Sequence, residues 1–236
     1  MSANYKARTA AKWLGIGTGV AAAGYATSVA LTWCRYGYAN REDKDRDLEL
    51  DRFMPIYDAV ERHRARVVAP AEITFSAACD LNIQKSTIVR ALFKSREFIL
   101  GGEPQETASP QGLIAQAKTW GWGVLAESAG AWIIFGGVTQ PWVANPVFRA
   151  LPPGEFAAFQ EPGYVKIAWT LRVDPVETAI SMARTETRVV TTDAVSRVKF
   201  RRYWACLLPG MKWIRRIALN LVKAEAERRA KLEGVK

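Results

Sequence analysis

The chain has 236 residues, of which 49% are hydrophobic and 24% charged, enough apolar content for a full core and too much for a disordered protein. The net charge is +10, and the segment from Asp193 to the C-terminus concentrates it, with twelve Lys or Arg against four Asp or Glu. The single histidine, His63, excludes a site with several histidine ligands, and the three widely separated cysteines show neither metal-ligand spacing nor a disulfide framework.

A run of 22 residues without formal charge, Trp13 to Cys34, lies between Lys12 and Arg35. As a helix rising 1.5 Å per residue it would be roughly 33 Å long, close to the thickness of the hydrocarbon core of a bilayer. Trp13 and Trp33 resemble the aromatic residues found at the two interfaces of a membrane helix. The run therefore predicts a single-pass N-terminal transmembrane helix at about residues 13–34.

A cleaved secretory signal and a buried soluble helix are the alternatives for this run. Lys6 and Arg8 supply the basic start of a signal, and Gly24-Tyr25-Ala26 supplies a small-residue cleavage site. The apolar character continues to Cys34, which suits a membrane span better than a signal core. Basic residues flank both ends in nearly equal number and leave the orientation open, while free thiols favour a cytoplasmic domain.

The next segment, Asn40 to Arg52, mixes charges of both signs without Gly or Pro. Such a composition is typical of a solvated spacer between a membrane and a domain. The predicted organisation is an N-terminal segment (1–36), a charged linker (37–52), a folded domain (53–231) and a short tail (232–236).

The folded domain is predicted to open with a strand and two helices. From Ala59 to Pro70 the residues alternate, which indicates a strand with Arg62, Arg64 and Arg66 on one face and His63 on the other. Pro70 then opens a helix to Leu81. A second helix is predicted over Ser86 to Leu100, and a loop over Glu103 to Gln111.

A hairpin follows, with arms Gly121 to Ser128 and Ala131 to Gln140 around the turn Ala129-Gly130. A two-residue turn pairs Ser128 with Ala131, and Val124 with Phe135. The inner face of this hairpin then carries five apolar side chains: Trp122, Val124, Ala126, Ile133 and Phe135. A short strand near Phe156 to Gln160 is predicted within the Pro-rich stretch that comes next.

Two more alternating segments, Tyr164 to Asp174 and Ser181 to Thr191, predict two further strands. Ile167 and Trp169 fall on the inner face of the first, and Thr185 and Thr187 on that of the second. Glu186, between Arg184 and Arg188, is interpreted as part of a charge ladder on the surface.

A long terminal helix is predicted after the N-cap Thr192-Asp193, kinked at Pro209 and ending at about Lys231. In its second half an apolar stripe is formed by Met211, Ile214, Ile217, Ala218 and Leu221. The order of elements indicates an α+β fold, in which a curved antiparallel sheet wraps around the long C-terminal helix.

Over about Phe53 to Lys223 the chain resembles the helix-grip superfamily called SRPBCC, which includes START lipid-transfer domains, birch-pollen-allergen-like proteins and polyketide cyclases. The resemblance rests on the element order and on three local patterns, Val67 to Glu72, Lys166 to Leu171 and Arg184 to Val189. It implies an apolar cavity between sheet and helix that binds lipids, sterols, polyketides or other hydrophobic molecules. The superfamily has no shared catalytic motif, so it implies no catalytic residue, and we expect no cofactor.

The candidate ligand-binding residues are those expected on the inner face of the sheet: His63, Trp122, Val124, Ile133, Phe135, Ile167, Trp169, Thr185 and Thr187. His63 is also the only candidate for an acid–base role, and the alternative is a histidine that hydrogen-bonds inside the domain. For the aromatic residues the alternative is a filled core.

The expected function is membrane-anchored, non-enzymatic binding of a hydrophobic small molecule or lipid. The alternatives are a structural or accessory subunit of a membrane complex, joined through the N-terminal helix, and a cyclase- or dehydratase-like enzyme that uses His63. A basic stretch in the last helix suits a solvated face or contact with anionic lipid: Lys199, Arg201, Arg202, Lys212, Arg215 and Arg216. Without a nucleic-acid-binding motif, no nucleic-acid partner is expected.

Overall fold

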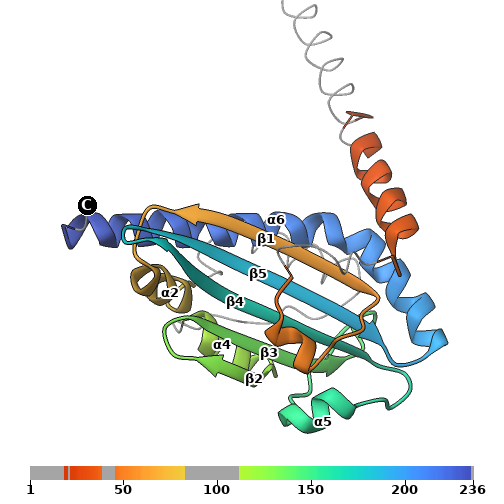
Figure 1. The fold of residues 1–236 in the computed structure, drawn as a ribbon. Helices are drawn as coiled ribbons and strands as arrows, with labels where there is room; N and C mark the ends of the chain where they lie inside the picture. Colours follow the sequence, from red (N-terminus) through yellow and green to blue (C-terminus); the bar gives the residue numbers. More distant parts are fainter. Residues whose placement is uncertain (1–18, 21, 39–45, 83–111, 235–236) are drawn as a thin grey trace, which may run out of the picture.

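The computed structural model describes residues 19–20, 22–38, 46–82 and 112–234. Within these ranges five antiparallel strands form one sheet in the order β1-β5-β4-β3-β2 (Figure 1). The strands are β1 (Ala59–Val67), β2 (Gly123–Ser128), β3 (Trp132–Thr139), β4 (Val165–Glu177) and β5 (Ile180–Thr191). Each of the strands predicted from alternation at 59–70, 164–174 and 181–191 is confirmed, as is the hairpin.

Helices lie on both faces of this sheet. The inner face is covered by α2 (Ala71–Cys79), α4 (Leu113–Thr119) and the long α6 (Ala194–Leu232). The outer face is covered by the 3-10 helix η1 (Glu49–Arg52) and by α5 (Pro153–Ala158). The predicted α+β architecture, an antiparallel sheet with a long C-terminal helix across it, is confirmed. The helix predicted at 86–100 lies outside the described residues, and α4 was not predicted.

The alternation along each strand decides which side chains meet the helices. Val67 of β1 and Ala183 of β5 pack with Leu219 and Ala226 of α6. Further along the sheet, Phe135 packs in one cluster with residues of α2, α4 and α6. These contacts define the inner face, and they confirm the side predicted for the odd-numbered residues of β5.

The outer face has a hydrophobic cluster of its own. Residues 50, 53, 54 and 57 of the segment that precedes β1 pack with Ile134, Val138, Ala168 and Phe156. The described part of the spacer predicted over Asn40 to Arg52 is therefore only partly solvated: Leu50 is fully buried and Asp47 is 8% exposed, whereas Leu48 is 71% exposed. The segment is held down because apolar residues follow its charges and cover an apolar patch of the sheet.

The hairpin differs from the predicted register near its turn. Its loop has three residues, Ala129-Gly130-Ala131, and Ser128 pairs with Trp132. Gly130 adopts a positive φ of 72°, as expected in such loops. A register shift between Val124 and Ala126 then restores the predicted pairing of Val124 with Phe135. Because of this shift Ala126 packs with the outer cluster, so its predicted place on the inner face is wrong.

The short strand predicted near Phe156 to Gln160 is also wrong, because that segment belongs largely to α5. Pro152 is the N-cap of this helix, Pro153 begins it, and Glu155 lies in its first turn. A proline at the first position and an acidic residue near the N-terminus both favour a helix. Phe156 is fully buried against the outer face of the sheet, which holds this short helix in place.

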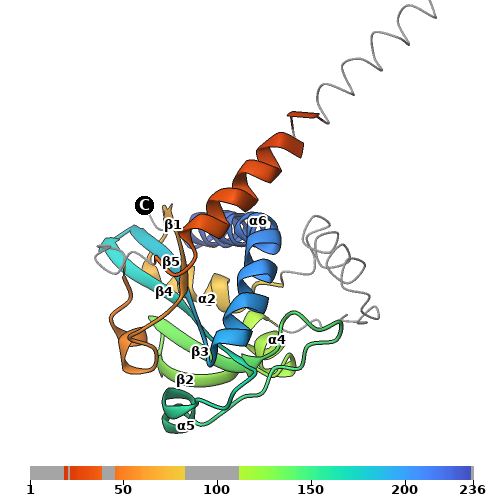
Figure 2. The ribbon, with the colours of Figure 1, turned by 90° about the vertical axis from the view of Figure 1, so that its right-hand side faces the viewer.

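The long helix α6 is continuous through Pro209, and Figure 2 shows its first part turned away from the direction of the rest. Proline lacks an N–H and clashes with the preceding turn, which accounts for the bend. The apolar stripe predicted along Met211 to Leu221 is displaced from the face that meets the sheet. Leu221 is exposed, whereas Leu219 and Val222 are buried.

An N-terminal helix over residues 22–35 lies beside the first part of α6 (Figure 2). The Tyr25 hydroxyl donates to the Cys206 carbonyl at 2.5 Å. Arg201 donates to the Trp33 carbonyl at 2.8 Å, and its guanidinium lies 4.2 Å from the centre of the Trp33 ring. The predicted span begins outside the described residues, at Trp13. Within the described part of the chain, no helix is both long enough and apolar enough to cross a membrane.

The N-cap of α6 predicts a pH-dependent contribution to stability. Hydrogen bonds from the Ser196 hydroxyl, the Ser196 N–H and the Gly163 N–H hold the pKa of Asp193 well below its usual value. A carboxylate with a lowered pKa stabilises the fold above the unfolded-state pKa of about 4, and this stabilisation is lost as the pH falls toward the folded-state pKa.

We expect Asp193→Ala to lower the free energy of unfolding at pH 7, and the difference from the natural chain to shrink as the pH falls below about 4. Asp193→Asn keeps one capping oxygen without the charge, so it should lose the pH-dependent part of the stabilisation and lie between the natural chain and Asp193→Ala at pH 7. Urea unfolding between pH 3 and pH 7 measures both effects. A difference that stays constant over this range would contradict the assignment.

Candidate functional site

The register of the sheet places one row of predicted site residues side by side. Val124 pairs with Phe135, Phe135 with Trp169, Trp169 with Thr187, and Thr187 with Glu61. His63 lies two residues beyond Glu61 on the same face of β1, opposite Thr185. The inner face therefore carries a continuous band that is aromatic on β3 and β4 and polar on β5 and β1.

The aromatic end of this band is built from three rings. Phe135 and Trp169 stack with ring centres 4.5 Å apart, and Trp122 meets Trp169 edge-on at 6.0 Å. Phe135 is fully buried, whereas Trp122 and Trp169 are half-buried. These geometries are the ones aromatic pairs prefer.

Part of the predicted site is filled core. Ile133 and Phe135 are enclosed by side chains of α2, α4 and α6. Ile167 packs at the other end of the sheet, with Phe200 and Trp204 of α6. Trp122, Val124 and Trp169 are half-buried and pack against the first of these clusters. The other predicted residues, His63, Thr185 and Thr187, lie on the inner face of β1 and β5.

The middle of α6 brings two cations to this part of the sheet. The Lys212 ammonium lies 3.2 Å from the Glu61 carboxylate, which in turn lies 3.6 Å from Nε2 of His63. Arg215, one turn further along, is half-buried. Burial lowers the pKa of its guanidinium to about 10, although the Glu61 carboxylate acts in the opposite direction. Arg215 therefore stays protonated at neutral pH.

Two buried polar atoms of this group have no hydrogen-bond partner in the structure: Nε2 of His63 and Oγ1 of Thr187. The side chain of His63 is 9% exposed, and Thr187 is 2% exposed. Glu61 is too far from Nε2 for a hydrogen bond. In folded proteins most buried polar atoms are paired, and these two unpaired atoms lie on one face of the sheet.

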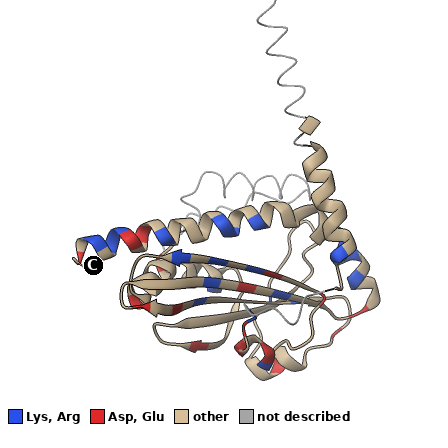
Figure 3. Ribbon diagram, turned by 45° about the horizontal axis from the view of Figure 1, so that its top comes forward, with Lys and Arg blue, Asp and Glu red and all other residues tan. Residues whose placement is uncertain are grey.

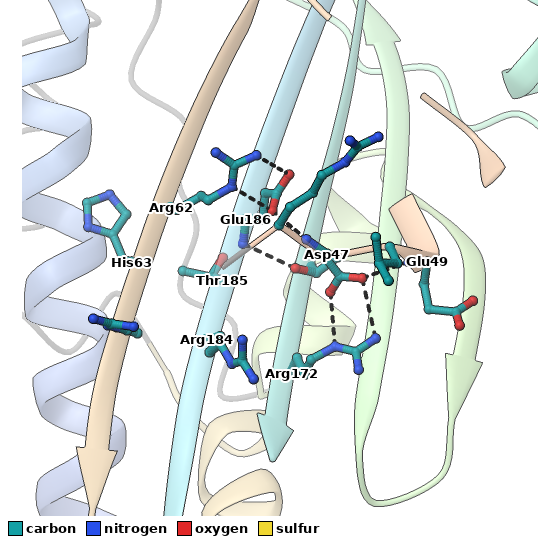
Figure 4. Close-up of a pocket in the computed structure, with 12 residues that line it drawn as sticks. Asp47, Glu49, Arg62, His63, Arg172, Arg184, Thr185 and Glu186 are labelled. Carbon is teal, nitrogen blue, oxygen red and sulfur yellow. Dashed lines mark hydrogen bonds and ion pairs between the residues drawn. The ribbon is translucent and has the colours of Figure 1, made fainter. Parts of the chain in front are cut away.

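The outer face holds a second feature, a cleft of about 440 Å³ between the sheet and residues 46–49 (Figure 4). Arg62 bonds both oxygens of Glu186, at 2.9 and 3.2 Å, and Arg172 bonds both oxygens of Asp47, at 3.0 and 3.3 Å. The backbone N–H of Asp47 donates to Glu186 at 2.8 Å. The lining of the cleft therefore consists largely of charges that neutralise one another.

Beside this cleft Arg188 is fully buried. Its guanidinium donates to Glu186 at 2.6 Å, to Asp51 at 2.5 Å, and to the carbonyls of Met54 and Asp47 at 2.8 and 2.7 Å. The surface position predicted for Glu186 and Arg188 is thus wrong, because the segment at 46–57 covers them, whereas Arg184 stays partly exposed and pairs with Asp174 at 2.6 Å. We interpret these ion pairs as the contacts that hold this segment on the sheet.

Neither feature resembles a metal centre. Among the described residues, no three side chains of His, Cys, Asp or Glu are grouped so that they could hold a metal ion. Sequence reasoning missed Glu61, Lys212 and Arg215 as site residues. Glu61 lies two residues from His63 in the alternating strand, so the sequence could have placed both side chains on the same face. Lys212 and Arg215 could not be placed, because they follow the bend in α6.

No protein-family model matches the chain, and no curated protein matches its sequence. Among solved structures, it is similar to a hypothetical protein from Helicobacter pylori with a TM-score of 0.36 and 9% identity, over 80% of this chain and 99% of that one. It is similar to the Zhui aromatase/cyclase from Streptomyces sp. R1128 with a TM-score of 0.27 and 13% identity, over 73% of this chain and 95% of that one. It is similar to Ara h 8.0201 with a TM-score of 0.19 and 9% identity, over 66% of this chain and 97% of that one.

These similarities assign no superfamily to the chain. All the TM-scores are below 0.5, so neither a ligand nor a reaction is transferred from them.

Proposed function

We propose that this chain binds a hydrophobic small molecule or lipid between the sheet and α6, without catalysing a reaction. The observation that carries the proposal is the pair of unpartnered buried atoms, Nε2 of His63 and Oγ1 of Thr187. A purely structural core would leave two buried polar groups unpaired, at a cost of about 1–3 kcal/mol each. A ligand lying along the half-buried ring of Trp169 would supply their partner and cover that ring.

A neutral apolar probe tests this proposal. We expect N-phenyl-1-naphthylamine to fluoresce on binding the full chain in mild detergent below its critical micelle concentration, and Trp169→Ala to weaken binding about tenfold. Trp132→Ala is the matched control, because Trp132 is a half-buried tryptophan on the outer face of β3. The proposal fails if the probe does not bind, or if both substitutions weaken it equally.

We further propose that the N-terminal run holds the domain at a membrane. Basic residues gather where the N-terminal helix meets the first part of α6 (Figure 3). Arg35, Lys199 and Arg202 are exposed there, beside Arg201. Clustered basic side chains next to an apolar helix favour a surface of acidic lipid.

Flotation tests this attachment. We expect the full chain to float with vesicles that contain phosphatidylserine and to stay with them after a carbonate wash. Recovery in the unbound fraction after that wash would exclude a membrane-spanning anchor. Recovery there before the wash would exclude membrane attachment altogether.

A reaction of cyclase or dehydratase type is the second candidate. It is favoured by Nε2 of His63 lying 3.6 Å from the Glu61 carboxylate, since such a pair can move a proton. Under this alternative His63→Gln would bind the ligand and leave it unchanged, whereas the natural chain would convert it.

A further inference from the structure

The cleft on the outer face of the sheet carries more positive than negative charge. Its lining has three carboxylates against five guanidinium groups, those of Arg46, Arg62, Arg64, Arg172 and Arg184. Just outside the lining, Asp51 and Asp174 add two negative charges, which are matched by the buried Arg188 and by Arg52. Among the described residues around the cleft, a surplus of arginine therefore remains whichever way the ion pairs are drawn.

Three of these arginines form one row across the sheet. Arg64 of β1 pairs with Arg184 of β5, and Arg184 pairs with Arg172 of β4. Figure 4 shows the side chains of Arg184 and Arg172 next to each other on neighbouring strands. Like charges directly opposite each other in an antiparallel pair are destabilising. Two such contacts in succession, beside a cleft of about 440 Å³, indicate a place where an anion would be stabilising.

The shape of the row favours phosphate over carboxylate. Arg172 bonds both oxygens of Asp47, and Arg62 both oxygens of Glu186, so in each pair a planar carboxylate faces one guanidinium edge-on. A phosphate group has three oxygen atoms that point in different directions, so it can accept hydrogen bonds from two neighbouring strands at once. Strands lie about 4.7–4.9 Å apart, so two linked phosphate groups can reach from β1 to β4. Because a guanidinium carries five N–H donors, Arg172 and Arg184 can bind phosphate while they keep their carboxylates.

From this arrangement we propose that the cleft is a second binding site, in which Arg64, Arg184 and Arg172 bind a ligand with two phosphate groups. The site lies on the face of the sheet opposite α6, so the inference does not depend on the proposed function. The phosphate groups belong to a soluble molecule or to a lipid head group, and the chemistry that recognises them is the same for both.

Calorimetric titration of the full chain with inorganic pyrophosphate, in mild detergent, tests the site. We expect one pyrophosphate per chain, bound more tightly than orthophosphate, because only the ion with two phosphate groups reaches all three arginines. Arg64→Gln should weaken binding about tenfold, the ratio that one charge-assisted hydrogen bond supplies. Arg66→Gln is the matched control, since Arg66 is also exposed and lies two residues further along the same face of β1, outside the lining of the cleft.

Urea unfolding separates a binding site from a purely structural cluster of charges. Pyrophosphate should raise the unfolding midpoint of the natural chain and of Arg66→Gln, and should raise that of Arg64→Gln less. Without pyrophosphate, Arg64→Gln should unfold like the natural chain, because an exposed charge contributes little to stability.

Vesicles distinguish the two sources of the phosphate groups. A preference for phosphatidylinositol bisphosphate over phosphatidylserine at equal surface charge, lost in Arg64→Gln and kept in Arg66→Gln, would assign the site to a lipid head group. Equal binding of both vesicles, with pyrophosphate bound, would assign it to a soluble ligand. The inference is overturned if pyrophosphate does not bind, if both substitutions weaken it equally, or if citrate binds as tightly.

Discussion

Replacing Arg188 with methionine should lower the free energy of unfolding by about 3–5 kcal/mol, the cost of breaking a buried ion pair from one side. The loss is large because Arg188 is fully buried and bonds two carboxylates and two backbone carbonyls. The substitution leaves Glu186, which is 2% exposed, with Arg62 as its remaining cation. Urea unfolding of the full chain, followed by circular dichroism, measures the change.

Arg149→Met is the control for this prediction, since Arg149 is exposed and forms its ion pair with the exposed Glu161. Such surface pairs contribute about 0–1 kcal/mol. Arg188→Met should also make the segment at residues 46–57 cleavable by protease before the rest of the domain unfolds. Equal stabilities of the two variants would contradict the role given to Arg188.

The second large effect is expected at Phe135. Truncation to alanine should cost about 3–5 kcal/mol, through lost burial and the cavity that remains. Phe135 is fully buried between the Trp169 ring and side chains of α2, α4 and α6. Thermal and urea unfolding give the loss.

Comparison with two other variants shows whether this part of the interior is filled. Phe135→Leu keeps most of the volume and should cost less than Phe135→Ala. Trp169→Ala should affect binding of the apolar probe more than stability, since Trp169 is only half-buried. If Phe135→Ala unfolds like the natural chain, the cluster around Phe135 is not a packed core.

The inner face of the sheet could be predicted because alternation in β1, β4 and β5 is strict. One parity places His63, Trp169 and Thr187 toward α6, and the structure agrees. Asp193 could be identified as the N-cap of α6 because a side-chain acceptor follows a strand directly there. These features depend on local sequence.

The outer layer could not be predicted in the same way. Asp47 and Asp51 look solvated when their segment is read alone. Their carboxylates pair with Arg172 and Arg188, which lie more than a hundred residues away in the sequence. The signal that was available is the apolar spacing of Leu50, Phe53 and Met54 just after the charges. A charged stretch that continues into apolar residues at helical spacing can be a covering segment.

The face of α6 that meets the sheet could not be predicted from the sequence either. Apolar residues extend around more than half of the helix between Met211 and Val222, so the periodicity does not select one face. The bend near Pro209 then decides the rotation of the second half of the helix, and it brings Arg215 toward the sheet. Tertiary packing fixes this rotation. For that reason the sequence assigned Lys212 and Arg215 only to a basic stretch and not to the candidate site.

Native mass spectrometry of the full chain, extracted in mild detergent, tests the central claim most directly. If the chain binds a hydrophobic molecule between the sheet and α6, it should appear with one added small mass. Trp169→Ala should carry less of this added mass, and Trp132→Ala as much as the natural chain. A chain found only at its own sequence mass, or bound in fixed ratio to another protein and to no small molecule, would contradict the account.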